Sequence, residues 1–172
     1  MAKKTAMGAF GRGKRRISPL GWGLRGAAAG AAGTTALDAV TYLDMAIRGR
    51  PASSSPERTV ESLAEKAHLA VPGDGQTRQN RLQGLGALTG YAAGVGIGVL
   101  VGLVRAAGFR SSPLVGTALI TGGVLVATNS PMTVLGVTDP RTWSTADWIS
   151  DVVPHLAYAA VVKATMDAFD RP

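Results

Sequence analysis

The stretch from position 82 to position 104 is mostly apolar and carries no charged residue, and glycine recurs in it at every fourth position from residue 86. The recurring glycines are Gly86, Gly90, Gly94, Gly98 and Gly102. This spacing places them along one slowly winding stripe of an α-helix. In a water-soluble helix each would cost about 1 kcal/mol relative to alanine. In lipid the backbone must stay helical, and a stripe without side chains lets another helix approach closely. The pattern therefore predicts a transmembrane helix over 82–104 whose glycines form a helix-packing surface.

Three further stretches are long enough to cross a bilayer core of about 30 Å, which takes about 20 helical residues. They span residues 21–47, 113–137 and 144–169. The first carries Asp38 near its middle, where neighbouring helices must shield a carboxylate from lipid. We therefore predict an all-α fold, an integral membrane helical bundle of four transmembrane helices, or of three if the first stretch stays on the membrane surface.

The last two predicted spans carry signals at their ends. Proline disfavours helical geometry in the residue before it, so Pro131 predicts that the third span bends or ends there. Ser144 stands three residues before Asp147, the spacing of a capping box. This pair predicts the start of the fourth helix.

The segment from 48 to 81 is hydrophilic and separates the first two spans. Pro56 follows a serine and precedes a glutamate, a pattern typical of a helix start. Apolar residues then fall on one face, which predicts a short amphipathic surface helix over 56–69. The Pro72-Gly73-Asp74-Gly75 sequence predicts a turn after it.

The net charge of +7 is concentrated at the N-terminus. Seven basic residues precede the first apolar run without an acidic residue among them: Lys3, Lys4, Arg12, Lys14, Arg15, Arg16 and Arg25. A basic arm over residues 1–20 would suit nucleic acid, but before a membrane segment it is typical of a cytoplasmic terminus. We predict a multi-pass protein of the bacterial plasma (inner) membrane with a cytoplasmic N-terminus and no nucleic-acid partner.

Basic residues also bear on the number of spans. Four spans place 11 basic residues inside and 7 outside, whereas three spans place 14 inside and 4 outside. Charge counting alone favours three spans. We retain four, because Trp22 and Tyr42 stand one span apart and the small residues of the first stretch need a packing partner. Arg15-Arg16 has the outline of a twin-arginine export signal, yet the residues after it match such a signal poorly and no small-x-small site is followed by an obvious mature domain, so we expect no cleavage.

Candidate chemistry is sparse. The chain has no cysteine, and its two histidines, His68 and His155, lie in different segments, so we expect no metal site. Gly84-x-Gly86 and the later glycines lack the spacing and the acidic residue of a dinucleotide fingerprint, so no cofactor is expected. A nucleophile motif of the GxSxG type is also missing. We predict a non-enzymatic protein.

Ionisable and polar groups within the predicted spans allow a second interpretation. Asp151 and His155 are one helical turn apart, Tyr158 stands close by, and Asp38 is on the first span. Together they could form a proton or cation relay within the bundle. The alternative is that the acids lie near the membrane interface and His155 bonds a neighbouring group.

The glycine stripe likewise has two interpretations. It either packs the helices of one chain together or docks a second copy or a larger membrane complex. Besides the lipid bilayer, we therefore expect a homo-oligomer or a membrane protein complex as partner. The predicted role is an accessory or structural component of a membrane assembly.

Several short motifs resemble those of a known group of proteins. They are Arg50-Pro51, Ser54-Ser55-Pro56-Glu57, and Pro154-His155-Leu156-x-Tyr158 in the last helix. With the small-residue first helix and the glycine-rich second helix, this layout resembles small four-helix bacterial inner-membrane proteins of the YagU-like type. The extended basic N-terminus and the glycine stripe depart from that group. The resemblance implies membrane residence and no enzyme activity.

Overall fold

The protein was analysed as a computed structural model, which describes residues 17–171. Within that range the regular structure is helical, which confirms the predicted all-α class. The elements are α1 (Pro19–Arg48), α2 (Ser55–Lys66), α3 (Gly75–Ala106), α4 (Pro113–Val134), the short 3-10 helix η1 (Pro140–Thr142) and α5 (Thr145–Ala168). Most of the predicted basic arm over 1–20, including the Arg15-Arg16 pair, lies outside the described residues.

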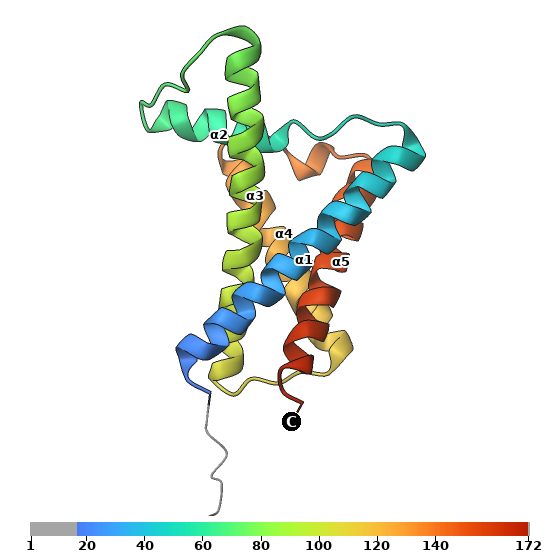
Figure 1. The fold of residues 1–172 in the computed structure, drawn as a ribbon. Helices are drawn as coiled ribbons and strands as arrows, with labels where there is room; N and C mark the ends of the chain where they lie inside the picture. The colour runs from blue at the N-terminus through green and yellow to red at the C-terminus, as the bar shows by residue number, and fades with distance from the viewer. Residues whose placement is uncertain (1–16, 172) are drawn as a thin grey trace, which may run out of the picture.

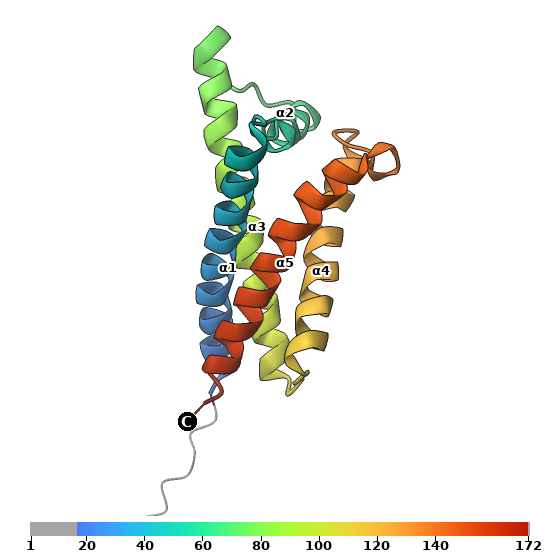
Figure 2. The same cartoon turned by 90° about the vertical axis from the view of Figure 1, so that its right-hand side faces the viewer.

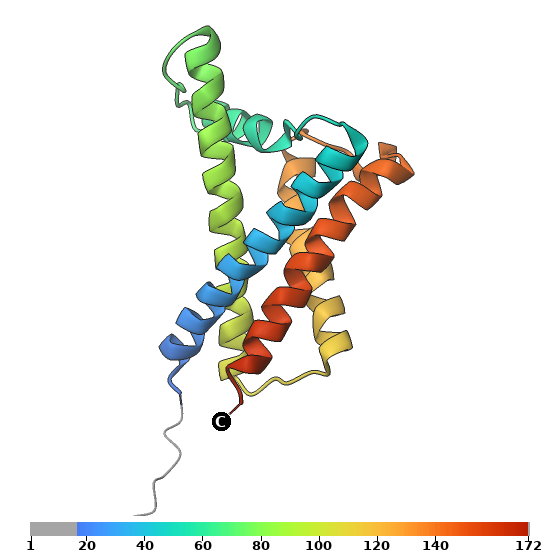
Figure 3. The same cartoon turned by 45° about the vertical axis from the view of Figure 1, so that its right-hand side comes forward.

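The four long helices run side by side, with successive helices pointing in opposite directions, while α2 lies across α3 at one end (Figure 1). α1 crosses α3 obliquely and packs most extensively against it, and next against α5. The turned views place α5 between α1 and α4 (Figures 2 and 3). α4 packs mainly against α5 and makes few contacts with α3.

Local sequence explains where several helices begin. The Ser18 and Ser112 side chains accept hydrogen bonds from backbone N–H groups in the first turns of α1 and α4, and a proline follows each serine. Ser144 and Asp147 form the predicted capping box at the start of α5. α1 ends at Gly49, whose φ of 63° is in the left-handed region that glycine adopts without strain.

Two helices run further than their apolar stretches alone would predict. α3 begins at Gly75, so two polar turns precede the uncharged stretch that starts at residue 82. α4 does not end at Pro131 but continues to Val134. The proline lacks one N–H donor, so one hydrogen bond to the preceding turn is lost while the turn after it stays helical.

α3 and α4 are each long and apolar enough to cross a membrane, and they are the two such helices within residues 17–171. Only 17% of the most apolar window of α3 and 11% of that of α4 is buried in the fold. A core helix of a soluble protein would be mostly buried, whereas these helices turn apolar side chains outward. α1 and α5 are also long enough, with 30 and 24 residues, but they are not among the helices with a stretch apolar enough to cross a membrane.

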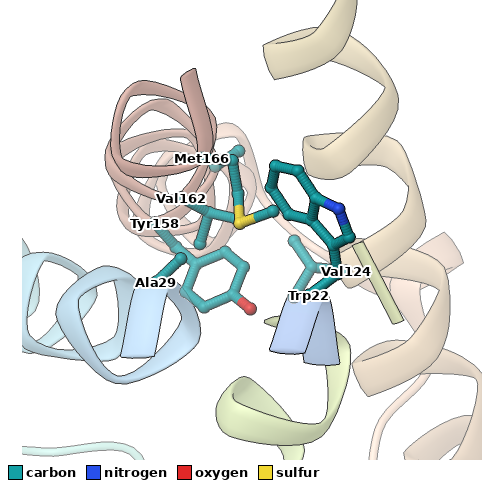
Figure 4. Close-up of a cluster of buried hydrophobic side chains, with 7 residues drawn as sticks. Trp22, Ala29, Val124, Tyr158, Val162 and Met166 are labelled. Carbon is teal, nitrogen blue, oxygen red and sulfur yellow. The ribbon is translucent and has the colours of Figure 1, made fainter. Parts of the chain in front are cut away.

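The core is a small cluster where α1, α4 and α5 meet. α5 contributes Tyr158, Val162 and Met166, which are fully buried. Figure 4 shows them packed against side chains of the neighbouring helices: Trp22 and Ala29 of α1 and Val124 of α4. The cluster thereby ties α5 to both neighbouring helices.

Candidate functional site: a glycine contact and a charged end of the bundle

The stripe of glycines on α3 meets a second set of glycines on α1. A Cβ atom added to Gly30 would lie 2.6 Å from the Gly94 carbonyl oxygen, and one added to Gly98 would lie 2.6 Å from the Gly30 Cα atom. Gly26 faces Gly98 and Gly102 in the same way. Real Cβ atoms do not approach other atoms so closely, so the two backbones are in direct contact.

The stripe does not face one partner along its whole length. Four residues advance an α-helix by about 40° beyond a full turn, so the glycines wind around α3. Gly86 accordingly faces Pro56 of α2, with the added Cβ 3.0 Å from the Pro56 carbonyl carbon. Gly90 has no atom within 4 Å of its added Cβ, so open space lies beside it. Only the last three predicted packing glycines therefore line the α1 side.

Tyr158 occupies a notch formed by small residues of two helices. Its hydroxyl donates a 2.6 Å hydrogen bond to the Gly94 carbonyl oxygen of α3. On the α1 side, a Cβ at Gly33 would lie 2.8 Å from the tyrosine ring and 2.6 Å from Val162. Tyr158 thus joins α5 to the contact between α1 and α3; Figure 4 shows its ring beside Ala29 of α1.

The four predicted relay residues do not form one chain of hydrogen bonds. His155 Nδ1 hydrogen-bonds the Asp151 backbone carbonyl oxygen at 2.7 Å and lies 3.4 Å from the Asp151 carboxylate. That carboxylate accepts a 2.8 Å hydrogen bond from Asn129 of α4. Asp38 accepts a hydrogen bond of 3.1 Å from the Tyr91 hydroxyl of α3. Within residues 17–171, no hydrogen bond or ion pair links Asp38 to Asp151, His155 or Tyr158. The structure therefore brings together one pair of the four.

A second cluster lies at the end of the bundle where α1 begins and α5 ends, the lower end in Figure 1. Its centre is Arg105 of α3, whose side chain is only 7% exposed. The guanidinium lies 2.5 Å from the carboxylates of both Asp167 and Asp170, and Lys163 also pairs with Asp167. Arg105 further donates a 3.3 Å hydrogen bond to the Met166 carbonyl oxygen. These contacts tie α3 to the last turns of α5.

Two more arginines surround this centre. Arg110 pairs with Asp170 at 3.1 Å, and Arg25 donates a 3.2 Å hydrogen bond to the Phe169 carbonyl oxygen. Both guanidinium groups lie over the Trp22 ring, 5.2 Å from its centroid for Arg25 and 5.4 Å for Arg110. We call this set the charged end cluster: Arg25, Arg105, Arg110, Lys163, Asp167 and Asp170.

Sequence reasoning treated these basic residues as topology markers and did not group them. One local signal was available, because Lys163 and Asp167 are spaced i, i+4 near the end of α5. The contributions of Arg25 and Arg105 depend on which helices meet, so spacing along the chain does not reveal them.

No group of three or more His, Asp or Glu side chains that could hold a metal ion occurs in the part of the chain that the structure describes.

Comparisons of the chain with protein-family models, with curated proteins and with solved structures find no match.

Proposed function

We propose that this chain is a four-span protein of the bacterial plasma membrane that acts without catalysis, as an accessory or structural component of a membrane assembly. The observation that carries the proposal is the outward-facing apolar surface of α3 and α4, of which little is buried within the fold. Such a surface needs lipid or an apolar partner, because water would strongly disfavour its exposure.

The positions of charged groups support four spans rather than three. α1 lies against α3 through direct backbone contact at Gly30 and Gly98. It therefore crosses the bundle alongside a candidate span. At one end lies the charged end cluster, and at the other Asp44 pairs with Arg50 at 2.5 Å. Charges at both ends with an apolar band between them suit a bilayer.

Cysteine labelling tests this topology in a chain that has no native cysteine. Ser54→Cys, in the exposed link before α2, should react with a membrane-impermeant maleimide in intact cells. Ala107→Cys, exposed between α3 and α4, should react only after the membrane is permeabilised, because it lies at the opposite end of the bundle. Labelling of both positions, or of neither, in intact cells would rule out the four-span arrangement.

The accessory role follows from where free surface remains. α1, α2 and α5 already occupy most of the glycine stripe, so a partner would meet the outer faces of α3 and α4, where Leu100, Leu119 and Val126 are exposed. Purification in mild detergent should yield a particle larger than one 17.6 kDa chain plus its micelle. A strictly monomeric particle with no co-purifying protein would refute the role.

The Asp151–His155 pair supports a second candidate function, proton or cation translocation. Both side chains are mostly buried, at 18% and 14% exposure, and Asn129 supplies a third polar group. A carboxylate and an imidazole held in this way could exchange a proton. In reconstituted vesicles Asp151→Asn should abolish any proton flux, whereas Asp139→Asn, in the exposed link before η1, should not. Flux at background level in the unaltered protein would end this candidate.

A further inference from the structure

A crevice of about 350 Å³ separates α3 from α4, next to the charged end cluster. Its volume is within the ~300–1,000 Å³ typical of small-molecule sites. The walls are aliphatic over most of their length, with Ile97 and Val101 on α3 and Leu119 and Ile120 on α4. The crevice exists because these two helices make few contacts with each other and pack mainly against others.

Polar groups gather at one end of this crevice. Arg105, Lys163 and Ser111 line it there, while the remaining lining side chains are apolar. Gly116, another lining residue, leaves room for Lys163, because a Cβ at Gly116 would lie 2.7 Å from the lysine Cδ and 2.6 Å from the Ser111 hydroxyl oxygen. The site is therefore amphipathic, with a long apolar part and a short cationic part.

The cationic part has donor capacity that the protein itself does not use. The Arg105 Nε–H group is buried and has no hydrogen-bond partner among residues 17–171, whereas Nη2 of the same guanidinium pairs with Asp167 and Asp170. An unpaired buried donor of this kind destabilises the protein, and a bound acceptor would relieve that cost. Arg105 and Lys163, which line the crevice, are matched by the carboxylates of Asp167 and Asp170. Arg25 and Arg110 add two further cations beside them, so the charged end cluster as a whole carries a formal charge of +2.

We infer that the crevice binds an anionic phospholipid, with an acyl chain between α3 and α4 and the phosphate at Arg105, Lys163 and Ser111. The apolar walls match an acyl chain, and the excess positive charge matches a negative headgroup rather than a zwitterionic one. The inference rests on the proposed membrane location. That topology places this end on the cytoplasmic side, where basic pockets between helices meet anionic lipids.

Two neighbouring glycines of α4 provide a matched test. Neither Gly122 nor Gly123 has an atom within 4 Å of an added Cβ, so both positions accept a side chain without clashing. Gly123 lines the crevice, whereas Gly122 does not. Gly123→Phe should therefore fill the site, and Gly122→Phe should leave it open.

Native mass spectrometry of the full chain in detergent can compare phosphatidylglycerol with phosphatidylcholine carrying the same acyl chains. We expect phosphatidylglycerol to bind about tenfold more tightly than phosphatidylcholine, because the excess of two cations in the charged end cluster would attract its negative headgroup. Gly123→Phe should weaken that binding about tenfold, and Gly122→Phe should not change it. Equal binding of the two lipids, or equal effects of the two variants, would overturn the inference.

A charge variant tests the headgroup part separately. Ser111→Asp adds a negative charge at the polar end without removing a buried cation, and should reduce phosphatidylglycerol binding to the level of phosphatidylcholine. Ser130→Asp, exposed near the far end of α4, should leave the lipid preference intact. Displacement of the lipid by inorganic phosphate alone would indicate a soluble anion site and overturn the lipid assignment. Correct topology without lipid preference would refute this inference but leave the membrane proposal standing.

Discussion

Gly98→Leu should destabilise the bundle by about 3 kcal/mol, because overpacking typically costs about 1–3 kcal/mol and here the obstacle is backbone. The added Cβ would lie 2.6 Å from the Gly30 Cα atom and would overlap the Gly26 carbonyl oxygen. Backbone cannot rotate away as a side chain can, so α1 and α3 would have to separate. Unfolding by SDS titration, followed by circular dichroism, measures the effect.

Gly90→Leu is the matched control for this substitution. Gly90 belongs to the same helix and the same four-residue series, but its added Cβ has no atom within 4 Å. The variant should change the free energy of unfolding by less than about 0.5 kcal/mol, as is usual for exposed positions. Similar destabilisation by both variants would mean that lipid contact, and not the α1–α3 contact, accounts for the stripe, because leucine has the higher helix propensity and cannot destabilise α3 in that way.

Removal of the buried guanidinium is the second substitution with a large expected effect. Arg105→Met leaves Asp167 to Lys163 and Asp170 to Arg110 alone. Breaking a buried pair from one side costs about 3–5 kcal/mol. We expect about 3 kcal/mol, the lower end, because Asp167 and Asp170 are 27% and 28% exposed and water screens them in part. The same SDS titration measures it.

A second substitution distinguishes charge imbalance from lost packing. If unpaired carboxylates cause the loss, Arg105→Met combined with Asp170→Asn should recover about 1 kcal/mol of it. Arg58→Met, on an exposed position of α2 with no ion pair among the described residues, should be nearly neutral. An additive double variant, with no recovery, would show that the methylene stem of Arg105 matters more than its charge.

Local patterns predicted most of the helices, because a helix depends on groups a few residues apart. The capping box of Ser144 and Asp147 and the long apolar helix of the glycine stripe are of this kind. Pro131 shows the limit of such a local pattern. Proline disfavours helical geometry in the residue before it, but it removes only one N–H donor, and α4 continues to Val134.

The candidate sites were only partly predictable. The spacing of Asp151 and His155 made their contact foreseeable, since residues four apart share a helix face. The spacing says nothing about Asp38, whose partner turned out to be Tyr91 on α3. The charged end cluster joins α1, α3 and α5, together with Arg110 after α3, and one i, i+4 pair was its only local sign.

The sequence by itself determined that the chain is helical and that the 82–104 stretch is apolar enough to span a membrane. It also determined that α3 carries a stripe of glycines. Composition and the spacing of residues along one helix set each of these features locally. Only the tertiary structure decided what covers the stripe and where charges meet. α1 brings its own glycines to Gly94, Gly98 and Gly102, while Gly90 stays open. Which helix approaches depends on the joint packing of all helices, a non-local property that periodicity cannot encode.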